Sequence, residues 1–86
     1  MAPEELAAIV RRRPFAPFRI TLAQGSTYEV RHPELCMPGR RSVILGLAQP
    51  GDPDLLFDRS VTIDLLHIVK PEPLEPTGAR TVNGPG

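Results

Sequence analysis

Two residues well suited to chemistry stand close together, His32 and Glu34. A histidine near a carboxylate can serve as a general base or as a polar contact for a bound ligand. A catalytic site needs a further partner for such a pair, and the spacing of the sequence supplies none. We therefore expect the ring of His32 to fill a loop, bonded to a backbone carbonyl or to Glu34. A ligand-binding or enzymatic role for the His32/Glu34 loop is the alternative.

The single cysteine, Cys36, stands between Leu35 and Met37. Apolar neighbours favour a buried thiol that behaves as a small hydrophobic side chain. Arg40 and Arg41 would lower its pKa if their guanidinium groups approached it. One cysteine excludes an intramolecular disulfide, and no nucleophile–base pair is visible, so the sequence predicts a protein that is not an enzyme.

The second histidine, His67, lies among the apolar residues Leu65, Leu66 and Ile68. This setting is typical of a half-buried residue that fixes a turn. Together with His32 and Cys36 it would offer a ligand set for zinc, but the chain has one thiol and no C-x-x-C spacing. The sequence therefore predicts neither a metal site nor a cofactor.

Arginines are the strongest candidates for binding a partner, since nine of the ten basic residues are Arg. Arg forms bidentate contacts with phosphate, which suits nucleic acid. The candidate residues form two clusters, Arg11, Arg12, Arg13 and Arg40, Arg41. RNA-binding modules usually expose aromatic side chains for base stacking, and the pattern assigns three of the four aromatic residues of this chain to the core. Weak binding of RNA through the arginines is therefore an alternative function.

Charge is balanced in sum but uneven along the chain, whose formal net charge is +0. Residues 11–41 hold seven arginines against two glutamates, whereas residues 42–75 hold two basic and six acidic residues. We expect folding to interleave the two halves so that their fields cancel. A basic face for an anionic partner and head-to-tail self-association are the alternatives.

The chain has 86 residues, of which 41% are hydrophobic, so it has room for one domain. No apolar run is long enough to cross a bilayer, and the acidic start lacks the features of a signal peptide. The sequence thus predicts a cytoplasmic protein without membrane contact. We expect residues 1–74 to form the domain and residues 75–86, which contain hardly any apolar side chains, to form a flexible tail.

A short helix over residues 3–13 is followed by several short strands. Pro3 suits the first helical turn, and Pro14 ends the helix. Alternation of apolar and polar residues predicts a hairpin over residues 18–31 with its turn at Gly25. Further strands are expected, after a loop over residues 32–41, at 42–47, 55–58, 61–64 and 68–74, with either a bulge or a second turn at Arg59 and Ser60. A helical turn capped by Asp64 precedes the last one, an edge strand because of its prolines.

This order predicts a mainly β fold, a small bent five-stranded barrel with a short N-terminal helix, as in Sm-like or SH3-like proteins. Four segments also resemble a group of small uncharacterised bacterial proteins: Pro14-Phe15-Ala16-Pro17-Phe18, Gln24-Gly25, Arg31-His32-Pro33-Glu34 and Leu65-Leu66-His67-Ile68. The resemblance implies no activity and no catalytic residues. In that group the last strand has an apolar residue where this chain has Pro71. The function that the sequence favours is a non-enzymatic module for binding or self-assembly, with a homo-oligomer as the expected partner.

Overall fold

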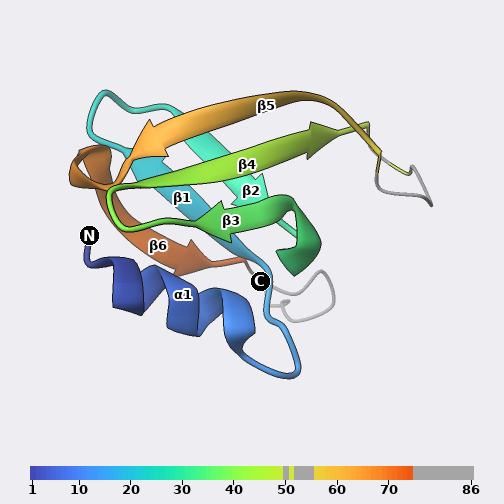
Figure 1. Cartoon of the computed structure of the whole chain (residues 1–86), viewed down its shortest axis with the longest axis horizontal. Coiled ribbons are helices and arrows are strands. Elements are labelled where there is room, and N and C mark those ends of the chain that lie inside the picture. The colour runs from blue at the N-terminus through green and yellow to red at the C-terminus, as the bar shows by residue number, and fades with distance from the viewer. Residues whose placement is uncertain (50, 52–55, 75–86) are drawn as a thin grey trace, which may run out of the picture.

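The computed structural model describes residues 1–49, 51 and 56–74. It shows one α-helix, two 3₁₀ helices and six strands, with the chain ordered from α1 at the N-terminus to β6 (Figure 1). The elements are α1 (Pro3–Arg11), β1 (Phe18–Leu22), β2 (Thr27–Val30), η1 (Pro33–Leu35), β3 (Cys36–Pro38), β4 (Ser42–Ala48), β5 (Phe57–Asp64), η2 (Leu65–His67) and β6 (Ile68–Pro73).

The strands form two antiparallel sheets, which confirms the mainly β prediction. Sheet A has the order β2-β1-β6 and sheet B has the order β3-β4-β5. Among the described residues the strands form two three-stranded sheets with no ladder between them, so the described chain does not show the predicted closed five-stranded barrel. The two sheets lie one behind the other in Figure 1, and α1 lies along their lower side.

Two differences from the predicted strands have local causes. Strand β3 lies inside the segment predicted as a loop, because three residues next to prolines are too few to show a period of two. Strand β5 is continuous across Arg59 and Ser60, where the sequence left a bulge and a second turn as alternatives. Its register against β4 shifts between Leu47 and Ala48, so the irregularity is a bulge within one strand.

Helix α1 ends at Arg11, two residues earlier than predicted, because Arg12 is already extended at φ −57° and ψ 137°. Pro3 stands in its first turn, and acidic residues there face the positive end of the helix dipole. The helix buries Leu6 and Val10, which are four residues apart and so lie on one face. This face attaches the helix to the core.

The hairpin of β1 and β2 is as predicted. Gly25 occupies its turn at φ +105°, a conformation that side chains rarely adopt. In β1, alternate residues Phe18, Ile20 and Leu22 are buried. These residues form the sheet A side of the core.

Strand β6 pairs normally with β1 despite its prolines. The amide of Leu74 donates to the carbonyl of Pro17 at 3.1 Å, and this bond shows which residues of β6 direct their backbone N–H and C=O groups toward β1. Glu72 therefore turns its backbone groups toward β1, whereas Pro71 and Pro73 have their nitrogens on the far side. The prolines cost no ladder bond, and the expected edge strand is confirmed.

One hydrophobic core lies between the sheets and the helix. Its fully buried side chains include Leu6 from α1, Ile20 from β1 and Val43 from β4, so every layer contributes. The buried set is Leu6, Val10, Phe18, Ile20, Leu22, Val30, Cys36, Val43, Leu45, Ile63, Leu65 and Ile68. In the part of the chain that the structure describes, no helix is both long and apolar enough to span a membrane. The segment 75–86, predicted as a tail, lies outside the described residues.

Candidate functional site

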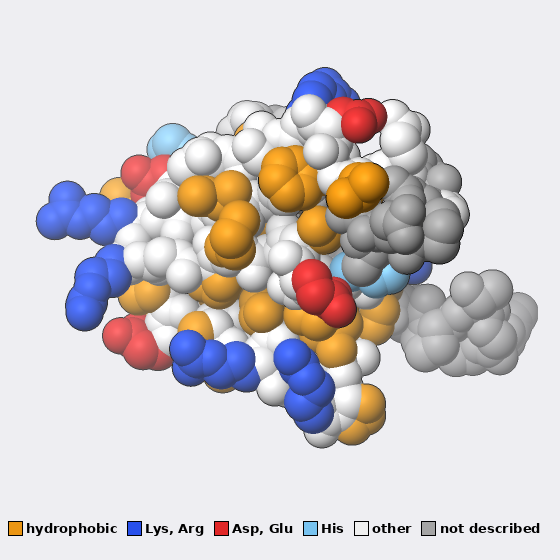
Figure 2. Space-filling view, turned by 45° about the vertical axis from the view of Figure 1, so that its right-hand side comes forward, with side chains coloured by type: hydrophobic (Ala, Val, Ile, Leu, Met, Phe, Trp, Pro, Cys, Tyr) orange, Lys and Arg blue, Asp and Glu red, His pale blue; other side chains and the backbone are white. Residues whose placement is uncertain are grey.

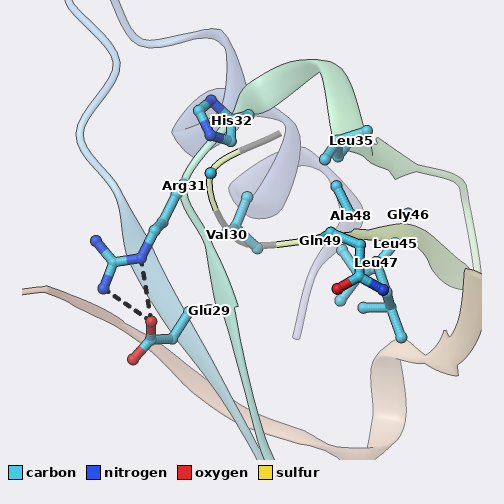
Figure 3. A pocket seen from close by; sticks show the side chains of 11 residues that line it. Glu29, Val30, Arg31, His32, Leu35, Leu45, Gly46, Leu47, Ala48 and Gln49 are labelled. Carbon is cyan, nitrogen blue, oxygen red and sulfur yellow. Dashed lines mark hydrogen bonds and ion pairs between the residues drawn. The ribbon is translucent and has the colours of Figure 1, made fainter. Parts of the chain in front are cut away.

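A notch of about 550 Å³ lies between the end of β2 and the distal half of β4 (Figure 3). Its apolar lining comes from Val30 in β2, Leu35 in η1, and Leu45 and Leu47 in β4. Its volume falls within the range of ligand-binding pockets, about 300–1,000 Å³. The complete lining is Glu29, Val30, Arg31, His32, Leu35, Leu45, Gly46, Leu47, Ala48, Gln49 and Gly51.

One wall of the notch is the outer edge of β2. The amide of Leu22 donates to the carbonyl of Ser26 at 2.8 Å, and this bond sets the alternation along the hairpin. Val30 therefore turns its backbone groups toward β1, while the amide and carbonyl of Glu29 and the amide of Arg31 point outward. None of these outward groups bonds to another described residue.

The opposite wall is the part of β4 that extends beyond β3. Strand β3 pairs with β4 only as far as Leu45. The amide of Gly39 donates to the carbonyl of Ser42 at 2.7 Å, so even-numbered residues of β4 turn their backbone groups toward the β3 side. At Ala48 this side no longer has a neighbouring strand among the described residues. The notch thus has open strand edge on two sides.

The charged residues of β2 lie on the other face of the strand. Figure 3 shows Arg31 and Glu29 on one side of β2 and the leucines of the notch on the other. Arg31 donates to the Glu29 carboxylate at 2.8 Å, and Arg19 of β1 approaches it at 3.5 Å. The hydrogen bond from Arg31, with a smaller contribution from Arg19, lowers the pKa of Glu29. Two guanidinium groups approach the Glu29 carboxylate, and on the same face Glu72 of β6 is paired in register with Arg19, so Arg31 is the guanidinium at the open edge of the sheet.

His32 and Glu34 are not brought together as a site. His32 is exposed and lines the notch, whereas Glu34 in η1 is exposed and does not line it. The expected bond from the His32 ring to Glu34 or to a carbonyl is not among the hydrogen bonds between described residues. The resulting arrangement offers one imidazole at the mouth of an apolar notch, a polar contact without a catalytic partner in the described chain.

Cys36 is 4% exposed, which confirms the prediction of a buried thiol. Burial raises the pKa of Cys36 to about 11, and neither Arg40 nor Arg41 contributes to this shift, so the condition under which they would lower it is not met. His67 is exposed rather than half-buried, because η2 turns it outward while Leu65 enters the core. Within the described ranges, no group of three His, Cys, Asp or Glu residues could hold a metal ion.

The arginine candidates separate into different settings. Arg11 and Arg40 line a groove of about 530 Å³ between α1 and the β3–β4 turn, together with Glu4. Arg13 donates to the carbonyls of Val10 and Arg12 at 3.0 and 2.8 Å, so it caps the helix end. Arg12 and Arg41 are exposed and lie outside this groove. The structure therefore brings together two of the five predicted residues.

Sheet B exposes an apolar patch that the sequence reasoning missed. Met37 and Ile44 are directly paired across β3 and β4 and are 51% and 39% exposed. Phe57 of β5 is 52% exposed. Gly46 lets the Phe57 ring lie close, since a Cβ there would stand 3.0 Å from it. The sequence signal that could have revealed this patch is the segment 42–47, whose residues are apolar on both faces of the strand.

The outward positions of sheet B carry no charge over most of its area. Around the pair of Met37 and Ile44, the residues of β4 and β5 that share this face are Ser42, Gly46, Ser60 and Thr62, and the exposed carboxylate of Asp64, opposite Ser42, lies at one end of it. Figure 2 shows hydrophobic side chains gathered on this side of the molecule, with most Lys and Arg side chains at the periphery. Large exposed apolar patches of this kind mark interaction surfaces.

Comparisons with protein-family models, with curated proteins and with solved structures found no match for this chain.

Proposed function

We propose that this protein is a non-enzymatic assembly module that self-associates through the outer face of sheet B. The observation that carries the proposal is the uncharged patch around Met37, Ile44 and Phe57. Interface cores are depleted of charged residues and enriched in Met and aromatic residues, which is the composition found here. A second copy is the favoured occupant because two uncharged faces meet without repulsion or the desolvation of a charge.

The geometry of the face suits packing against an identical face. Sheets stack face to face at about 10 Å, and side chains of intermediate size fill that space. A two-fold contact places the same patch on both sides and closes the assembly at a dimer. The earlier head-to-tail alternative receives less support, because folding already places an acidic residue of the second half, Asp64, opposite Ser42, the chain neighbour of Arg41.

The test is a charge placed in the centre of the patch. Ile44→Lys should weaken self-association at least about tenfold, since a buried unpaired ammonium opposes the contact. The matched control is Leu66→Lys, at an exposed leucine (85%) in η2 outside the patch, which should leave association unchanged. Sedimentation equilibrium measures both. A monomeric wild-type chain at high concentration, or equal effects of the two variants, contradicts the proposal.

A second candidate function is weak binding of RNA at the groove of Arg11 and Arg40. It is favoured by the convergence of these residues from separate elements and by the lack of an ion pair for either among the described residues. Arg11→Gln with Arg40→Gln should abolish binding at low salt, while the control pair Arg12→Gln with Arg41→Gln should retain most of it. Equal losses in the two pairs would remove this candidate. We also propose that this fold is related to those of Sm-like and SH3-like proteins, because an N-terminal helix is followed by short antiparallel strands.

A further inference from the structure

We propose that the outer edge of β2 binds an extended peptide as a fourth strand of sheet A, with apolar side chains in the notch and an acidic side chain on the opposite face. This surface is separate from the outer face of sheet B. The inference therefore does not rest on self-association, and either can fail alone.

The main-chain groups carry the first step of the argument. Glu29 offers an amide and a carbonyl, and Arg31 offers an amide, all directed away from β1. An unpaired strand edge is a template for a further strand, whose main chain bonds to these groups without using side-chain specificity. The notch adjoins these groups, so there is room for a chain beside β2.

The side chains of the notch carry the second step. Val30 points toward the core side of sheet A, and Leu35 and Leu47 line the notch opposite it. In a strand paired with β2, alternate side chains enter this apolar space. The bound segment therefore needs an apolar residue at every second position.

The charges beside β2 carry the third step, because they determine which sign of charge the ligand needs. The remaining positions of the added strand lie beside Glu29 and Arg31, on the outward face. Among the described residues, Arg31 at the strand edge forms an ion pair only with Glu29, whereas Arg19 lies between Glu29 and Glu72, its register partner in β6. An acidic residue opposite Arg31 completes the pairing, whereas a basic residue adds a third positive charge.

The probe is the acetylated peptide Thr-Val-Glu-Val-Thr with a C-terminal amide, titrated into the full chain and followed by amide chemical shifts. We expect shifts along β2 and at the notch residues of β4. The same peptide with Lys in place of Glu should bind at least about threefold more weakly, because a surface ion pair contributes little but measurable energy. N-methylation of its Glu should abolish binding, since in an antiparallel pair the amide of the residue opposite Arg31 faces β2.

Two variants of Arg31 separate the contribution of its backbone amide to peptide binding from that of its side chain. Arg31→Ala and Arg31→Pro both remove the guanidinium, but only the second removes the outward amide, so it should bind about five- to tenfold more weakly than the first. Glu29→Gln should strengthen binding of the acidic peptide, opposite to the effect of Arg31→Ala. If Glu29 and Arg31 only stabilised the fold of β2, the two variants would change the affinity for the peptide in the same direction.

Three results overturn the proposal. These are no shifts at millimolar peptide with an intact spectrum, equal binding of the N-methylated peptide, and shifts confined to sheet B. If the peptide fails and Arg31→Pro instead lowers self-association, a second copy occupies this edge and the peptide proposal is wrong. Should Arg31→Pro fail to fold, the N-methylated peptide still decides the question with the wild-type chain.

Discussion

The buried thiol of Cys36 gives a prediction that can be worked out numerically. We expect native Cys36 to react far more slowly with iodoacetamide than the same residue in urea. The reagent attacks the thiolate, and burial raises the pKa of this thiol from 9.0 to about 11. Its side chain is also almost inaccessible in the folded chain, so reagent must wait for a local opening.

The thiolate fraction sets the minimum size of the effect. At about pH 8, a thiol with a pKa of about 11 is about 0.1% ionised, whereas one with the ordinary value of 9.0 is about 10% ionised. The native rate should therefore be at least about a hundredfold lower, before any loss of access is counted. The folded state favours the protonated thiol, so this contribution to stability is present below about pH 9 and is lost as the pH rises through about 11.

The assay is the rate of alkylation measured by mass spectrometry against pH, with and without urea. The native rate should keep rising up to about pH 11, while the rate in urea levels off near pH 9. Arg40→Gln with Arg41→Gln is the control and should not change the native profile. A native rate within about threefold of the unfolded rate, or a profile that levels off below pH 9, refutes the reasoning and restores Cys36 as a candidate nucleophile.

Three stability predictions follow, each measured by urea unfolding. Val43→Ala should lower the free energy of unfolding by about 2–3 kcal/mol, because this side chain is fully buried. The control Val69→Ala, at an exposed valine, should change it by less than about 0.5 kcal/mol. Similar losses in the two variants would contradict the placement of Val43 in the core. Asp64→Ala should cost about 1 kcal/mol, since its carboxylate accepts the Leu66 amide at 2.9 Å, and Asp64→Asn should restore most of that; no difference would exclude the cap. Gly25→Ala should cost about 1–2 kcal/mol through its positive φ alone, since a Cβ there meets nothing within 4 Å, and an unchanged stability would show that the turn relaxes.

Local signals in the sequence were enough to predict the helix, the first hairpin, the capped turn and the edge strand. The hairpin carries a glycine at its turn and strict alternation on both sides, so every contact that defines it lies within 13 residues. Asp64 similarly acts on an amide two residues away. Such features are set by neighbours in the chain and need no knowledge of the rest of the molecule.

The arrangement of two sheets could not be read from the same signals. Whether β6 pairs with β1 depends on residues about fifty positions apart, and alternation does not name a partner strand. The apolar patch has the same origin, because Ile44 looks like a core residue until the position of β3 shows which face points outward. The notch exists because β3 pairs with β4 only as far as Leu45, and the alternation of apolar residues does not show where such a pairing ends.

The two prolines of β6 also set the stoichiometry of anything that binds to sheet A. A sheet with two open edges is a bifunctional unit, which can polymerise without limit. Here the far side of β6 lacks two of its amide donors at Pro71 and Pro73, so addition can propagate only from β2. We therefore expect sheet A to accept an added strand at β2 alone, which would end growth in a discrete complex rather than a fibre.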